Sequence, residues 1–167
     1  MERSGKWVAR AGLGALAGML MVTTALASPE RLAGTWTLVA ADVVTPDGVR
    51  ARAYGDDPQG RMIVDAEGRY SIEILKSGRA KFASGDKRKG TPAEYQDAVV
   101  GTSAHYGVIK DDPAAGLLTF TIEQSAYPNW TGTVQVRRYV LNGDELSYQP
   151  AAAQEGPAPI TVWRRVK

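Results

Sequence analysis

The sequence predicts an all-β domain, an eight-stranded up-and-down antiparallel barrel with one short inserted helix. Three observations support this prediction. Short segments alternate between apolar and polar side chains, as strands buried on one face do. Several are joined by short connections containing glycine, such as Ala66-Glu67-Gly68 and Asn142-Gly143. A helical period replaces the alternation in one place. About eight such strands favour a closed barrel, and a two-sheet sandwich is the alternative.

The N-terminus has the pattern of a secretory signal peptide. Three basic residues precede the uncharged stretch Ala11–Thr24, and Ala25-Leu26-Ala27 follows as an A-x-A cleavage motif. The uncharged stretch is shorter than the roughly 20 residues of a membrane-spanning helix. We therefore expect residues 1–27 to be a signal peptide and residues 28–167 to be a periplasmic or secreted domain. No stable membrane insertion is expected after cleavage.

Charge and cysteine content exclude several classes of function. The whole chain has 20 Lys and Arg against 18 Asp and Glu. The predicted signal peptide carries three of the former and one of the latter, so 17 of each remain. A neutral domain is a poor candidate for nucleic-acid binding. The absence of cysteine excludes disulfides, thiolate chemistry and zinc–cysteine sites.

The stretch Leu32–Val44 is the first expected strand. Gly34 permits a turn in the backbone, and Trp36, Leu38 and Ala40 then share one face of an alternating segment. A bulky indole at the start of a half-buried strand is suited to closing the end of a small barrel.

The remaining elements follow from periodicity and turn signals. The other expected strands are Gly60–Asp65, Arg69–Lys76, Ala104–Lys110, Leu117–Gln124, Trp130–Leu141, Asp144–Gln149 and Ile160–Val166. Between the second and third of these, Thr91 and Glu94 form a capping-box pattern with Pro92 at the first helical position. The pattern predicts a helix of about three turns that ends near Gly101.

An ordered set of motifs runs along the expected domain. It includes Gly34-Thr35-Trp36, Thr91-Pro92-x-Glu94, His105-Tyr106-Gly107, Pro128-Asn129-Trp130-x-Gly132 and Trp163-Arg164-Arg165. This set resembles the bacterial and fungal lipocalin-like domain proteins, a branch of the calycin superfamily. The resemblance implies a barrel that holds a small apolar molecule. Members often carry a histidine before the Pro-Asn-Trp turn, where this chain has Thr119-Phe120-Thr121, which argues against an activity that depends on that imidazole.

The resemblance also implies a closed end where an arginine of the last strand lies across the tryptophan of the first. We assign Gly34, Trp36 and Arg164 to this closure. Arg164 is chosen because Ile160 and Val162 share its face of the last strand. A guanidinium stacked on an indole contributes about 0.5–2 kcal/mol.

The barrel interior is expected to bind a small hydrophobic or amphipathic ligand. Strict alternation places Arg138 in an apolar row with Val136, where an unpaired charge is costly. Arg138 is therefore an anchor for a ligand carboxylate or polar headgroup, the partner of a protein acid, or turned outward by a bulge. The expected ligand-binding residues are Tyr70, Ile72, Phe120, Ile122, Val136 and Arg138, with Trp36 and Leu38 also lining the barrel.

A second hypothesis is a cofactor-free isomerase, cyclase or lyase that acts on an apolar molecule in the same cavity. His105 or Tyr106 would move the proton, and Arg138 would stabilise a developing oxyanion. His105 is the single histidine of the chain. One histidine without cysteine cannot form an ordinary zinc site, although it could ligate haem. We expect no metal and no cofactor, and the sequence specifies neither the ligand nor the oligomeric state.

Overall fold

The computed structural model describes residues 29–152 and 156–167, so the predicted signal peptide lies outside the described residues. The strands are β1 (Gly34–Val44), β2 (Arg50–Ala51), β3 (Gln59–Val64), β4 (Arg69–Leu75), β5 (Thr102–Asp112), β6 (Leu117–Ser125), β7 (Val134–Asn142), β8 (Glu145–Pro150) and β9 (Ala158–Arg165). The helical elements are η1 (Pro29–Arg31), α1 (Pro92–Val100) and η2 (Pro128–Trp130).

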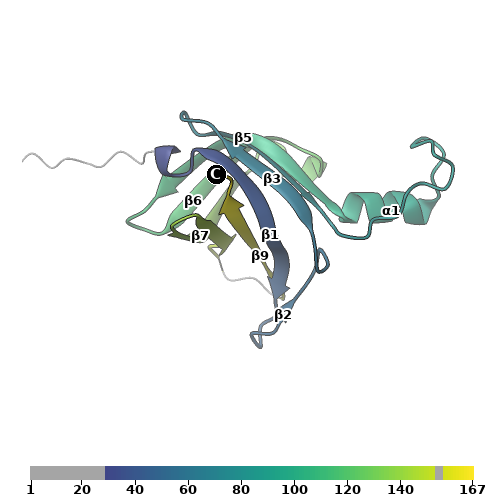
Figure 1. Cartoon of the computed structure of the whole chain (residues 1–167), viewed down its shortest axis with the longest axis horizontal. Coiled ribbons are helices and arrows are strands. Elements are labelled where there is room, and N and C mark those ends of the chain that lie inside the picture. The colour runs from purple at the N-terminus through teal and green to yellow at the C-terminus, as the bar shows by residue number, and fades with distance from the viewer. Residues whose placement is uncertain (1–28, 153–155) are drawn as a thin grey trace, which may run out of the picture.

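Eight of these strands close into a barrel (Figure 1). Each pairs with the next in the order β1, β3, β4, β5, β6, β7, β8, β9, and β9 pairs back onto β1. Every pairing is antiparallel, and the closing pair runs from Trp36 opposite Arg165 to Val44 opposite Ala158. The short strand β2 pairs with the last residues of β1. The predicted eight-stranded antiparallel barrel with one helix is therefore confirmed.

Local sequence explains the hairpin between β3 and β4. One carboxylate oxygen of Asp65 accepts hydrogen bonds from the backbone N–H groups of Glu67 (3.0 Å) and Arg69 (2.7 Å). Gly68 adopts a φ of 81°, which a residue without a side chain reaches at little cost. β4 then alternates as expected, with Tyr70, Ile72 and Ile74 buried and the residues between them exposed.

The capping box predicted at Thr91 is present at the start of α1. The Thr91 side chain accepts a hydrogen bond from the backbone N–H of Glu94, and the Glu94 carboxylate accepts one from the N–H of Thr91 at 2.6 Å. None of the α1 residues is buried, and the helix projects from the barrel wall in Figure 1. Among the described residues, no helix has the length and apolar composition needed to cross a bilayer.

The observed elements differ from the expected ones in three places. A strand was expected from Trp130, but Pro128–Trp130 is a 3-10 turn and β7 begins at Val134. The strand β2 was not expected. In β1, the pairing with β9 shifts between Leu38 and Ala40, so that Ala41 rather than Ala40 continues the buried row. This irregularity is a β-bulge, in which an extra residue reverses the alternation that follows it.

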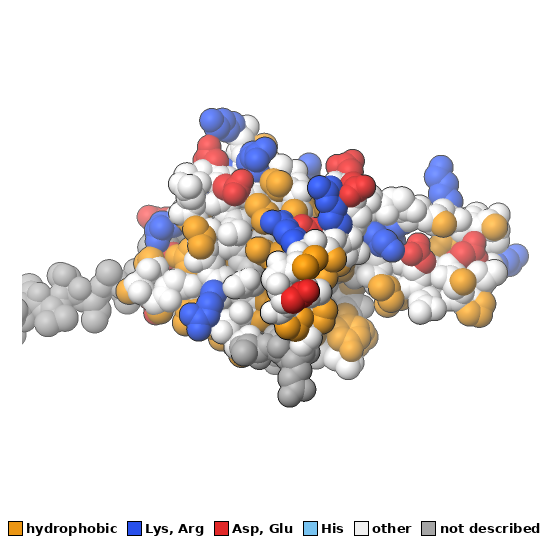
Figure 2. All heavy atoms as spheres, turned by 90° about the horizontal axis from the view of Figure 1, so that it is seen from below, with side chains coloured by type: hydrophobic (Ala, Val, Ile, Leu, Met, Phe, Trp, Pro, Cys, Tyr) orange, Lys and Arg blue, Asp and Glu red, His pale blue; other side chains and the backbone are white. Residues whose placement is uncertain are grey.

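The two ends of the barrel are unlike. We call the end where β1 begins, beneath η1, the closed end, and the end where β1 finishes, beside η2 and α1, the open end. Large buried apolar side chains fill the barrel from the closed end toward its middle. They include Leu32, Trp36, Met62, Leu118, Ile122 and Trp163. On the outer face shown in Figure 2, Lys and Arg side chains are interspersed with Asp and Glu and with hydrophobic residues.

Candidate functional site

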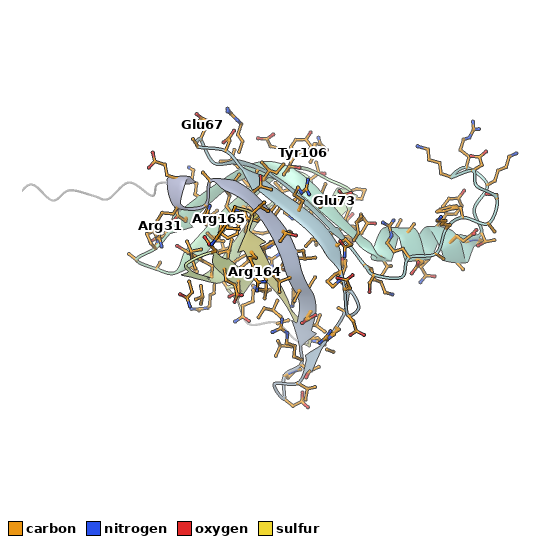
Figure 3. All side chains as sticks on the ribbon, in the orientation of Figure 1. Arg31, Glu67, Glu73, Tyr106, Arg164 and Arg165 are labelled. Atoms are coloured by element: carbon orange, nitrogen blue, oxygen red, sulfur yellow. The ribbon has the colours of Figure 1, made fainter. Side chains whose placement is uncertain are left out.

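The closed end is built around Trp36. Its indole is fully buried, and Nε1–H donates a hydrogen bond to the carbonyl of Leu32 at 2.9 Å. The guanidinium of Arg165 lies 4.1 Å from the indole ring centre and donates to the carbonyls of Ala33 (2.5 Å) and Arg31 (2.7 Å). Figure 3 shows Arg31 and Arg165 close together beside η1. These contacts hold η1 across the end of the barrel.

The arginine that covers Trp36 is therefore Arg165, and the prediction of Arg164 was wrong. Residues directly opposite each other on antiparallel strands share a face of the sheet, and Arg165 is the residue opposite Trp36. Arg164 lies opposite Thr37, on the outer face. Its side chain is 61% exposed, and it pairs with Glu145 at 3.6 Å.

Two further groups complete the closed end. Gly34 has a φ of 129°, and a Cβ atom at this position would lie 3.1 Å from Nη1 of Arg165. The glycine thus leaves room for the guanidinium. The carboxylate of Asp111 is buried beneath η1, 3.8 Å from the Arg31 guanidinium. The negative charge at this end of the barrel therefore has a cation beside it.

A cavity of about 140 Å³ lies at the open end. Its wall combines small and apolar groups, among them Ala41 and Ile74, with the aromatic side chains of Trp130 and Tyr148. Because these residues come from β1, β4, β8 and η2, the cavity is a product of barrel closure and not of one hairpin.

A larger groove of about 410 Å³ lies beside α1, next to the cavity. Tyr54, Ser103 and Trp130 line both spaces, and the apolar residues Val99 and Val100 of α1 line the groove. The cavity and the groove therefore share part of their walls.

His105 lies in the cavity wall with a fixed set of neighbours. Its Nδ1 is 2.8 Å from the hydroxyl of Tyr70, and its ring packs edge-on against Trp130 with ring centres 5.9 Å apart. Burial, and secondly the positive charge of Arg137, lower the pKa of His105 to about 4. Burial also raises the pKa of Tyr70 above its ordinary value. Both groups are thus neutral at pH 7.

The lowered pKa of His105 predicts a pH-dependent stability. Because the unfolded chain binds the proton with the ordinary pKa of 6.5, stability falls as the pH drops from 6.5 toward 4. The difference corresponds to about 3 kcal/mol lost from the free energy of unfolding. We expect the wild type to lose about this much more than His105→Gln between pH 7 and pH 3.5, as measured by urea unfolding. Equal losses in the two proteins would contradict the assignment.

The strand β7 turns its polar row inward, which reverses the prediction. Arg137 lines the cavity, whereas Val136 and Arg138 are exposed on the outside of the barrel. The Arg137 guanidinium donates a hydrogen bond to the side-chain oxygen of Gln135, the preceding inward residue. Arg138 instead donates to the carbonyl of Ala151 at 3.2 Å. Val136 and Arg138 are therefore not ligand-binding residues within the barrel.

The other expected ligand-binding residues are buried but lie around the cavity rather than in its wall. The rings of Tyr70 and Phe120 pack edge-on with centres 5.2 Å apart, and each contacts the ring of His105 in the same manner. Ile72 and Ile122 belong to the apolar core. This set supports the wall residues and fixes the orientation of His105.

The two catalytic candidates, His105 and Tyr106, lie on opposite faces of the barrel wall. His105 faces the cavity, and Tyr106, the next residue, is 49% exposed on the outer surface, where Figure 3 shows it. Tyr106 therefore cannot act on a molecule in the cavity. In the described part of the chain, no group of three or more His, Cys, Asp and Glu side chains is arranged to hold a metal ion.

The comparison with protein families identifies a match over most of the chain. A family model described as a lipocalin-like domain matches residues 33–166, which covers most of the chain and all nine strands. Neither the search of curated proteins nor that of solved structures returned a match.

Proposed function

The chain belongs to the lipocalin-like domain family, and from this premise we propose that it binds a small amphipathic molecule in the cavity at the open end. We further propose that it does so outside the cytoplasm, after export directed by residues 1–27 and cleavage behind Ala27. The observation that supports binding is the contrast between the two ends. Trp36 and Arg165 seal one end, while a cavity with aromatic and polar walls lies at the other.

Catalysis in the same cavity is the alternative, and the ionisation of its groups favours binding. A general base or acid works best with a pKa near the working pH. The pKa of His105 is lowered to about 4 and that of Tyr70 is raised, so the first is a weak base and the second a weak acid at neutral pH. The proposed role of His105 is to shape the wall and to orient polar atoms of a ligand, while Tyr70 holds its ring in place.

Filling the cavity tests this proposal. Ala41 is buried in the cavity wall, so Ala41→Phe places a ring where the ligand would lie. We expect at least a tenfold loss of affinity for one-ring probes such as benzyl alcohol and benzoate in calorimetric titrations, because a filled site offers no contact surface.

The matched control is Ala40→Phe, which adds the same ring at the neighbouring residue that the bulge turns away from the cavity. This variant should bind as the wild type does, and thermal unfolding should show that both variants are folded. Wild-type affinity in a folded Ala41→Phe protein would place the binding site elsewhere and overturn the proposal.

A further inference from the structure

Arg137 is the charged residue in the wall of the cavity. It is the next inward-facing residue of β7 after Gln135, and it is half-buried. Water is partly excluded from this half-buried side chain, and burial lowers the pKa of Arg137. A cation that is partly removed from water needs a compensating partner.

The described residues supply no such partner. No carboxylate oxygen among them lies within 4.0 Å of the Arg137 guanidinium. The neutral amide of Gln135 accepts one of its hydrogen bonds. The closed end differs, because there Asp111 has Arg31 beside it. Among the described residues, Asp111 thus has an opposite charge beside it and Arg137 has none.

The neighbours of Arg137 keep the site cationic without adding a second charge. His105 is neutral at pH 7, because its pKa is about 4. Tyr148 is also neutral, since burial raises the pKa of its hydroxyl. The Tyr148 hydroxyl accepts a hydrogen bond from the indole N–H of Trp163 at 3.2 Å, which fixes its position. The cavity therefore presents one positive charge among neutral groups.

The size and walls of the cavity limit what can accompany a negative charge. A volume of about 140 Å³ is close to the 150 Å³ or so of an apolar cavity that binds benzene. The rings of Trp130 and His105 meet edge-on in the wall, and such aromatic surfaces favour a flat apolar body. A cavity of this volume does not hold a long chain.

We infer that the ligand is a small monocarboxylate with one flat ring, whose carboxylate pairs with Arg137 and whose ring packs against Trp130. This inference depends on the proposed binding function and adds the chemical class of the ligand. A guanidinium suits the task because its parallel N–H groups match the two oxygens of a carboxylate.

Three probes of nearly equal shape test the inference in the intact domain. Benzoate, benzamide and benzylamine differ mainly in charge and can be compared by calorimetric titration. We expect benzoate to bind the wild type at least tenfold more tightly than benzamide, and benzylamine to bind most weakly. Arg137→Gln removes one charge-assisted contact, so this variant should bind benzoate on the order of 10- to 100-fold more weakly than the wild type. Its affinity for benzamide should change less than threefold.

Arg138→Gln is the matched control, because it removes the same charge one residue away on the outer face. It should leave the affinity for benzoate within twofold of the wild-type value. A loss equal to that of Arg137→Gln would mean that general surface charge attracts the probe, and would overturn the inference.

The remaining outcomes separate the two proposals. Equal affinity of the wild type for benzoate and benzamide would overturn the anionic ligand while leaving small-molecule binding in place. If none of the three probes binds, both the ligand class and the proposed function are contradicted. If Arg137→Gln does not fold, the preference of the wild type for benzoate over benzamide decides the matter alone.

Discussion

Trp36→Ala is expected to lower the free energy of unfolding by about 4 kcal/mol, because the substitution empties the closed end of the barrel. The indole is fully buried, and it carries both the hydrogen bond to Leu32 and the stacked guanidinium of Arg165. Two effects add to the loss. The substitution leaves a cavity, and it removes the partner of the Leu32 carbonyl and of the Arg165 guanidinium. Urea unfolding followed by circular dichroism measures the change.

Trp36→Phe serves as the control for this prediction. It keeps an aromatic surface for Arg165 but not the indole N–H that bonds to Leu32. We expect an intermediate loss of about 2 kcal/mol. A loss below 1 kcal/mol for Trp36→Ala would show that this end of the barrel contributes little to stability.

Gly107→Ala is expected to be nearly as damaging, for a different reason. A Cβ atom at Gly107 would lie 2.0 Å from the backbone oxygen of Thr121 and 2.9 Å from the backbone nitrogen of Glu123. The pairing of β5 with β6 shifts at this residue, so the two backbones approach where no side chain fits. Since backbone atoms cannot rotate away, we expect a loss on the order of 4 kcal/mol.

Gly143→Ala provides the comparison. This hairpin glycine has a φ of 57°, and a Cβ atom there would have open space around it. We expect a cost of about 1 kcal/mol from the left-handed backbone alone. If Gly107→Ala cost no more than Gly143→Ala in the same unfolding experiment, the close approach of β5 and β6 would be refuted.

The architecture could be predicted because barrel strands are marked in the sequence by alternating apolar and polar residues and by turn residues between them. The burial of Tyr70, Ile72 and Ile74 follows the apolar positions of their strand. The start of α1 follows from Thr91 and Glu94, whose side chains bond as the capping pattern requires. These signals are local, so one sequence is enough to read them.

The candidate site could be predicted only in part, because each strand has two faces and apolar character does not always mark the inner one. On β7, valines occupy the outer face, where their strand propensity suffices, and Arg137 occupies the inner one. On β9, Thr161 and Trp163 face inward and Ile160 does not share their row. For this reason the sequence pattern predicted Arg138 in place of Arg137 and Arg164 in place of Arg165.

A signal for the correct face was nevertheless present. Aromatic residues accompany the inner row, with Tyr139 following Arg137 on β7 and Trp163 preceding Arg165 on β9. Large aromatic side chains are a better marker of a barrel interior than valine, since they gain most from burial. The bulge after Leu38 gave no such signal, because it depends on how β1 pairs with a strand more than 100 residues away.

The most direct test of ligand entry at the open end is a nuclear magnetic resonance titration that follows the indole N–H signals of Trp130 and Trp36 as benzoate is added. Trp130 lines the cavity, and Trp36 lies at the closed end. The expected result is a saturable shift of the Trp130 signal with one benzoate per chain, and no shift of the Trp36 signal. A shift of Trp36 with Trp130 unchanged would contradict binding at the open end.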